Sequence, residues 1–148
     1  MGFLGSYQHT LDPKGRVFIP KKILAQVAPN EPRQFTITRG FERCLTLFTQ
    51  SAWDVHVSLI QKQAQGEKQV RDFKRILFSL AVTQPIDSSG RILIPENLRQ
   101  QAGLRREVMF VGMEDTVEVW DAETWKSYST EVSSDFEKQG EKVFQWKP

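Results

Sequence analysis

The amino-acid sequence predicts an α+β fold, mainly β, in which one structural unit occurs twice. Three observations support this: a nine-residue motif that returns 75 residues later, strand-like segments that return 72 or 73 residues later, and helix-forming segments after each set. A chain of 148 residues with 39% hydrophobic and 26% charged residues has the size and composition of one or two small globular domains.

The repeated motif begins with a turn and continues into a strand. Residues 12–20 read DPKGRVFIP and residues 87–95 read DSSGRILIP. The spacing Asp-x-x-Gly is typical of a type I turn, in which the aspartate side chain bonds backbone amides and glycine takes a left-handed conformation. The β-favouring residues that follow predict a short strand, and Pro20 and Pro95 suit the first position of a helix. The predicted turn-forming residues are Asp12, Gly15, Asp87 and Gly90.

Each motif is followed by a predicted β-hairpin. Residues 35–38 and 45–48 form the first pair of strand-like segments, and residues 108–111 and 117–120 form the second. Three of these segments alternate as half-buried strands do, while 108–111 is continuously apolar, which is typical of a strand buried on both faces. Two copies of one unit of about 50 residues explain both repeats.

Helical segments follow both hairpins. Ser51 with Asp54 three residues later resembles a capping box, and Asp121 is placed to cap the last helix. We expect residues 133–148 to form a frayed tail, in which Phe144 and Trp146 are candidates for docking on a neighbour. The predicted organisation is a first unit at 1–53, a helical connector at 54–83, a second unit at 84–128, and the end of the C-terminal helix with the tail at 129–148.

Charge is distributed unevenly along the chain. The net charge is only +2, but residues 1–75 carry 12 basic and 6 acidic side chains, whereas residues 76–148 carry 8 and 12. The halves are therefore +6 and −4, which favours an electrostatic role for the first half or head-to-tail attraction between copies. The alternative is that both are solvated faces that differ by chance.

The sequence lacks the motifs of common catalytic sites. No phosphate-binding loop, dinucleotide fingerprint or nucleophile elbow occurs, and His9 and His56 are not at metal-ligand spacing. Cys44 is the single cysteine, which fits a reducing cytosol and a role in packing. No apolar segment approaches the length of a membrane span or a secretory signal. We therefore expect no enzyme activity, no metal or cofactor, no small-molecule substrate and no membrane partner.

An arginine follows the glycine of both turns, although a turn and a strand do not require one. The guanidinium groups of Arg16 and Arg91 therefore need a partner. One interpretation is an intramolecular carboxylate, Asp12 or Asp87; the other is a nucleic-acid phosphate or a guanine edge. Basic residues cluster at the first loop but are replaced in the second, so the first loop is the stronger DNA-binding candidate. The cluster is Lys14, Arg16, Lys21 and Lys22, and the second copy has Ser89, Glu96 and Asn97 where three of these lysines stood.

The paired Asp-x-x-Gly-Arg-x-x-Ile-Pro segments resemble the AbrB/SpoVT-like DNA-binding unit. Two such units in one chain of this length resemble the MraZ family of bacterial transcriptional regulators. The resemblance covers almost the whole chain, and its flanking segments are Phe3-Leu4-Gly5, His9, residues 75–81 and residues 118–121.

The resemblance implies a pseudo-two-fold, intertwined β-barrel with swapped hairpins, flanked by helices. It also implies a ring-shaped homo-oligomer that binds short direct repeats of double-stranded DNA in the promoter of its own cell-division and cell-wall gene cluster and represses it. Such a regulator is cytoplasmic and nucleoid-associated. On this resemblance Lys14 and Arg16 contact DNA, and Lys21 and Arg91 are further DNA-binding candidates.

A different class of function remains open. The chain could be an interaction or assembly module, antitoxin-like or a scaffold, that does not bind DNA. In that case Arg16 and Arg91 act as internal braces of their turns.

Overall fold

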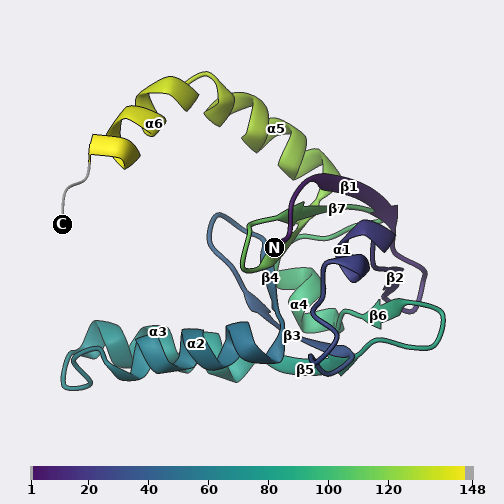
Figure 1. Ribbon diagram of the computed structural model, residues 1–148, viewed down its shortest axis with the longest axis horizontal. Helices are drawn as coiled ribbons and strands as arrows, with labels where there is room; N and C mark the ends of the chain where they lie inside the picture. The colour runs from purple at the N-terminus through teal and green to yellow at the C-terminus, as the bar shows by residue number, and fades with distance from the viewer. Residues whose placement is uncertain (1, 146–148) are drawn as a thin grey trace.

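The computed structural model describes residues 2–145, which form two antiparallel sheets and six helices (Figure 1). The strands are β1 (Ser6–Thr10), β2 (Arg16–Phe18), β3 (Gln34–Arg39), β4 (Leu45–Phe48), β5 (Val82–Pro85), β6 (Arg91–Leu93), β7 (Glu107–Gly112) and β8 (Val117–Asp121). The helices are α1 (Lys21–Ala25), α2 (Gln50–Gln61), α3 (Lys68–Leu80), α4 (Glu96–Gln101), α5 (Ala122–Ser133) and α6 (Phe136–Gln145).

The strand pairs cross between the two sequence units. The larger sheet has the order β1-β7-β8-β4-β3-β5, so β1 of the first unit pairs with the second hairpin and β5 of the second unit pairs with the first. In the repeat, β5 corresponds to β1, β7 to β3 and β8 to β4. If each strand is exchanged for its counterpart, the order read from the other end is the same. The repeat is therefore expressed as a pseudo-two-fold arrangement centred on the β4–β8 pair.

The predicted closed barrel does not form within the described residues. Strands β1 and β5 remain the edges of the six-stranded sheet, and β2 and β6 pair only with each other. Both strands of this small pair have only three residues, and they lie against β1 and β5 without continuing the larger sheet's hydrogen bonding. The fold is thus α+β with a mainly antiparallel sheet. The swapped-hairpin description and the predicted domain boundaries stay predictions.

One hydrophobic core is shared by both units. Val17 and Ile92, which face each other in the β2–β6 pair, are each 1% exposed, and Ile19 and Ile94 of the motif are buried beside them. The segment predicted to be buried on both faces is only partly so, because Met109 in β7 is half-buried under α5. Since both motif strands pack into the same core, neither unit buries its apolar face alone.

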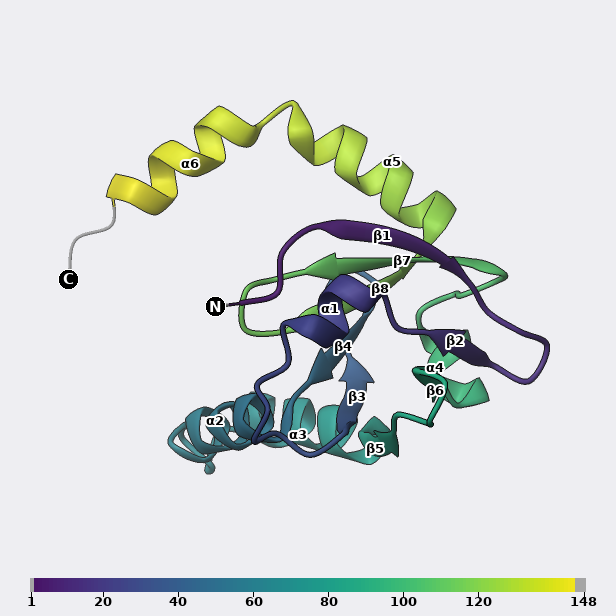
Figure 2. The same cartoon turned by 45° about the vertical axis from the view of Figure 1, so that its right-hand side comes forward.

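Two helical arms leave the sheet on the side away from the motif loops (Figures 1 and 2). Helices α2 and α3 lie antiparallel as one arm, and α5 continues into α6 as the other. The prediction of a frayed tail after residue 133 was wrong for residues 136–145, which form α6. Its apolar residues Phe136, Val143 and Phe144 recur at helical spacing, a pattern that the surrounding polar residues obscure. Trp146 lies outside the described residues.

The helix starts refine two further predictions. Asp121 caps α5 as expected, with its carboxylate accepting the Thr124 amide N–H. Helix α2 is instead capped by Thr49, whose hydroxyl accepts the Ala52 amide N–H, because the Ser51 hydroxyl donates to Glu31. Both motif prolines stand immediately before the first helical residue, in the capping position.

The shared core predicts a single unfolding transition. Ile92→Ala should lower the free energy of unfolding by about 2–5 kcal/mol, because it leaves a cavity between the two motif strands. The neighbouring Leu93 is 42% exposed, so Leu93→Ala should change the free energy of unfolding by only about 0.5 kcal/mol. Urea denaturation followed by circular dichroism and tryptophan fluorescence measures both. Separate transitions for the two probes would contradict a shared core.

Candidate nucleic-acid interface

Both motif loops adopt the predicted turn. In the first, the Gly15 amide donates to the Asp12 carbonyl at 3.0 Å, and the Asp12 amide donates to the Arg16 carbonyl at 2.8 Å. In the second loop the corresponding distances are 3.0 and 2.9 Å. Gly15 and Gly90 have φ angles of 87° and 91°, a left-handed conformation in which a side chain is strained. The glycines are therefore required by the turn itself.

The aspartate of each loop organises the backbone around it. Oδ1 of Asp12 accepts the amide N–H groups of Lys14 and Arg16, both at 2.9 Å. Oδ1 of Asp87 accepts the amides of Ser89 and Arg91 in the same way. These hydrogen bonds from backbone amides, together with the hydrogen bond from the arginine side chain, hold the pKa of both carboxyls below the ordinary value.

The arginine of each loop is braced by the aspartate of the same loop. Nε of Arg16 donates to Oδ2 of Asp12 at 2.7 Å, and Nε of Arg91 donates to Oδ2 of Asp87 at 2.9 Å. This is the intramolecular pairing that the sequence left as one of two alternatives. The terminal Nη groups of both arginines make no hydrogen bond to any described residue, so the brace orients each guanidinium and still leaves donors for a ligand.

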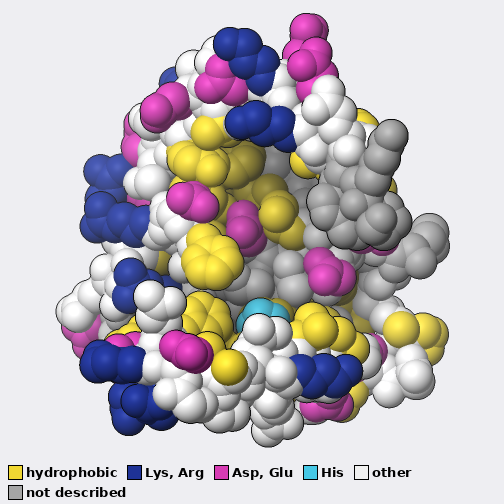
Figure 3. Space-filling view, turned by 90° about the vertical axis from the view of Figure 1, so that its left-hand side faces the viewer, with side chains coloured by type: hydrophobic (Ala, Val, Ile, Leu, Met, Phe, Trp, Pro, Cys, Tyr) yellow, Lys and Arg dark blue, Asp and Glu magenta, His cyan; other side chains and the backbone are white. Residues whose placement is uncertain are grey.

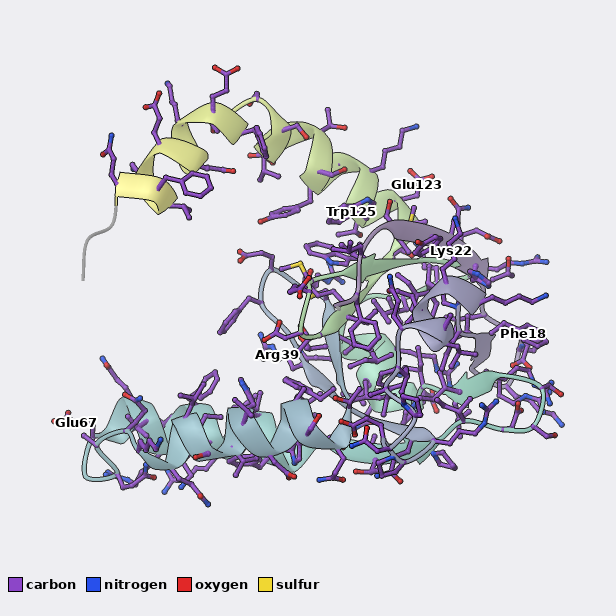
Figure 4. The ribbon with its side chains drawn as sticks, in the orientation of Figure 1. Phe18, Lys22, Arg39, Glu67, Glu123 and Trp125 are labelled. Atoms are coloured by element: carbon purple, nitrogen blue, oxygen red, sulfur yellow. The ribbon has the colours of Figure 1, made fainter. Side chains whose placement is uncertain are left out.

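The β2–β6 pair brings the two loops to one end of the molecule. The Ile19 amide donates to the Gly90 carbonyl and the Ile94 amide donates to the Gly15 carbonyl, both at 2.9 Å. Each loop is thus bonded to the strand that leaves the other loop. Figure 4 shows Phe18, at the end of β2, on this end of the molecule, far from Glu67 at the tip of the α2–α3 arm.

The two loops present their arginines differently. The Arg91 guanidinium lies over the ring of Phe18, its cross-strand partner, at 5.8 Å from the ring centroid. Arg16 has the aliphatic Leu93 as its cross-strand partner instead. Because a cation over an aromatic face is stabilised there, Arg91 is held by two interactions where Arg16 is held by one.

The predicted lysines are all exposed. Lys14 lies at the tip of the first loop, and Lys21 and Lys22 begin α1; Figure 4 labels Lys22 on that helix. The second loop has exposed Ser89 at the place of Lys14. The structure thus brings Arg16, Arg91 and Lys14 to the loop end of the molecule, with Lys21 following on α1.

Sequence reasoning missed arginines that each unit contributes to the loop of the other. The Arg106 carbonyl accepts the Leu11 amide just before the first loop, and the Arg33 carbonyl accepts the Ile86 amide just before the second. Arg99 on α4 lies against Gly15. Arg33 and Arg106 occupy equivalent positions in the repeat, and that equivalence could have marked them as candidate site residues. Which loop each one lies beside depends on strand pairs between the units, which the sequence does not reveal.

The remaining polar residues do not form a second centre. Burial raises the pKa of the Cys44 thiol well above its ordinary range, which suits packing. Burial lowers the pKa of His9 and of His56, whose rings pack against Phe110 and Phe48 respectively. Among residues 2–145 no group of three metal-ligating side chains is gathered, and no helix has the length and apolar character of a membrane span.

A family model described as "MraZ protein, putative antitoxin-like" matches residues 2–76 and again residues 77–147. The chain belongs to the MraZ family. The two matches show that the sequence repeat corresponds to two tandem MraZ units.

Curated relatives carry the name transcriptional regulator MraZ. The protein of Acetivibrio thermocellus is 38% identical over 141 residues, which cover 95% of this chain and 96% of the relative. That of Finegoldia magna is 36% identical, with coverages of 91% and 92%. Among solved structures, PHS018 from Pyrococcus horikoshii is 15% identical over 80% of this chain and 89% of that one, with a TM-score of 0.33, a similarity too low to support a conclusion.

The braced aspartates predict a specific acid sensitivity. Their pKa values are lowered in the folded state, so their stabilising effect is complete above the unfolded pKa of about 4 and is lost as the pH falls through the folded values. Asp12→Asn with Asp87→Asn should flatten the decline of unfolding free energy below pH 4. Urea denaturation at several pH values measures this, and equal slopes for both proteins would contradict it.

Proposed function

We propose that this MraZ-family protein is a sequence-specific transcriptional repressor that binds short direct repeats in the promoter of its own cell-division and cell-wall gene cluster. The observation that carries the proposal is the pair of loops at one end of the fold, each with a guanidinium oriented by its own aspartate and with free Nη donors. The names of the relatives support transcriptional regulation. A regulator of this kind acts in the cytoplasm on nucleoid DNA.

The proposed contacts divide by chemistry. Arg16, less restrained than Arg91, is placed to reach a phosphate or a guanine edge, because a guanidinium fork matches both. Lys14 and Lys21 supply point charges for neighbouring phosphates. Few contacts of this kind give weak binding at physiological salt, so one chain alone is a poor binder.

We propose that assembly into a ring-shaped homo-oligomer converts weak contacts into tight binding. Several loops that engage successive DNA repeats raise the effective concentration of each further contact. The spacing of the repeats must then match the spacing of loops between neighbouring copies.

The helical arms support this assembly. No residue of α6 is buried, and its Phe136, Val143 and Phe144 are 74%, 69% and 89% exposed. Val55 and Leu59 on α2 are 61% and 54% exposed, and with Phe41 and Phe73 they form the apolar part of a hollow that Asp115 and Glu118 also line. Figure 3 shows hydrophobic side chains gathered in the hollow between the arms.

We propose that the occupant of this hollow is α6 of a second copy. An isolated ten-residue helix is marginal in water, so α6 needs a partner. Residues 50–80 carry five basic and three acidic side chains, whereas residues 122–145 carry three and five. The arms are therefore +2 and −2, which favours a head-to-tail contact between copies and repels like arms.

A specific observation favours the alternative of an interaction module: both arginines are already paired with carboxylates of their own loops. On this alternative, Arg16→Ala lowers thermal stability or oligomer mass and leaves DNA affinity unchanged.

The DNA-binding proposal predicts a loss of affinity without a loss of fold. Arg16→Ala should weaken binding to the upstream region of the gene by about 1–3 kcal/mol per engaged loop, because it removes a charge-assisted contact. The control is Arg75→Ala combined with Asp72→Asn on α3, which removes an arginine and its ion-pair partner far from the loops and leaves the net charge of that arm at +2. Fluorescence anisotropy over a salt titration measures both. A DNA affinity that does not change with salt concentration would refute the proposal. So would an Arg16→Ala variant that keeps the wild-type affinity in an intact oligomer.

The assembly proposal predicts that a charge in the arm contact reduces oligomer size. Phe144→Asp or Val55→Asp should shift the mass measured by light scattering toward the monomer, because a carboxylate cannot enter an apolar contact without a partner. Gln145→Asp makes the same charge change on the opposite side of α6 and should leave the mass unchanged. Retention of the wild-type mass by both variants would show that the arms do not join copies.

A further inference from the structure

The first loop has an arginine pressed against it that the sequence unit of that loop does not contain. Arg99 belongs to α4 of the second unit, and its guanidinium lies so close to Gly15 that a Cβ there would stand 2.8 Å from Cζ and 2.9 Å from Nε. Nε of Arg99 is shielded from solvent and has no hydrogen-bond partner among the described residues. A phosphate cannot reach Nε while it is shielded, so an external anion must meet Arg99 through the part of its side chain that lines the open cleft beside Asp12 and Pro13.

A second arginine lies beside the same loop. The side chain of Arg106 is 82% exposed, and its nearest carboxylate, Glu107, is 4.0 Å away and already accepts the Thr10 hydroxyl. Arg99 and Arg106 line one open cleft of about 580 Å³ with Asp12 and Pro13 of the loop. The charge of Asp12 is taken by Arg16, so it does not neutralise either of the two.

Arg105 lines the same cleft but has a different role. Its Nη2 donates to Oδ2 of the buried Asp121 at 2.8 Å, and its Nε donates to Oδ1. This pair fixes the start of α5 and cancels the charge of Arg105. The net positive charge of the cleft therefore comes from Arg99 and Arg106.

The second loop lacks this arrangement. The residue nearest to a Cβ at Gly90 is Leu24, with Cδ1 at 3.5 Å, where the first loop has Arg99. Arg33, the counterpart of Arg106, donates through Nη2 to the Asp87 carbonyl at 3.1 Å. The greater positive charge at the first loop is therefore built by residues of both units.

We infer that Arg99 and Arg106 of the second unit complete a DNA-phosphate site at the first loop, continuous with Lys14 and Arg16. This inference rests on the proposed function and names residues that the motif does not include. The backbone of duplex DNA fits the site because its phosphates recur at short intervals, and Lys14 lies between Pro13, which lines the cleft, and Gly15, which Arg99 contacts. Contacts of this type set orientation and affinity and carry no sequence information.

The test compares Arg99→Gln and Arg106→Gln with a double variant of the remote α3 arm, Arg75→Gln with Asp72→Asn, which leaves the net charge of that arm unchanged. Binding of the full-length protein to its own upstream DNA and to an unrelated duplex is measured over a salt series. Each cleft variant should weaken binding to both DNAs equally, by about five- to tenfold per engaged loop near 0.1 M salt, and reduce the salt slope by about 1. The α3 double variant keeps the net charge of the arm, so it should match wild type in oligomer mass and in DNA affinity.

Arg106→Gln covers the case in which Arg99→Gln fails to fold, because the Arg106 side chain is exposed and its replacement tests the cleft without changing a buried group. If wild type binds DNA and Arg16→Ala weakens it, but the cleft variants equal the α3 double variant, the inference is overturned and the proposed function stands. Variants that change oligomer mass but not DNA affinity assign the cleft to an acidic segment of another copy, and also overturn it.

Discussion

The reciprocal bonding between the two motif strands is the interaction on which the rest of the structure depends. The Ile19 and Ile94 amides each donate to the glycine carbonyl of the opposite loop, and Val17 faces Ile92 between them. These contacts join segments about 75 residues apart, so they form only when both units are in place. They place the loops side by side, and that juxtaposition makes a two-loop surface from a sequence in which the loops are distant.

On the proposed function, the aspartate brace orients the loop arginines before DNA binds. A free arginine side chain loses rotamer entropy when a ligand immobilises it. Arg16 and Arg91 have already lost much of it, because each Nε is bonded to its own aspartate. The intramolecular pair and a DNA contact are therefore compatible, since they use different nitrogens of the same guanidinium.

Local features of the fold could be predicted from the sequence, and non-local ones could not. The spacing Asp-x-x-Gly determines the turn within four residues, so Asp12 and Gly15 were found without a structure. The expected barrel stays open because β1 and β5 remain edges of the six-stranded sheet while β2 and β6 pair only with each other. Arg99 was missed for a related reason: it reaches the first loop only through the fold.

On the proposed function, DNA binding and assembly are located at opposite ends of the molecule. The loops carry charge and free donors, whereas the arms carry exposed aromatic and aliphatic side chains at the other end (Figure 2). In a head-to-tail assembly a contact at the arms leaves every loop open, and the loops of neighbouring copies then act on one DNA. A change at either end weakens binding for a different reason: a loop change alters each contact, and an arm change alters how many contacts act together.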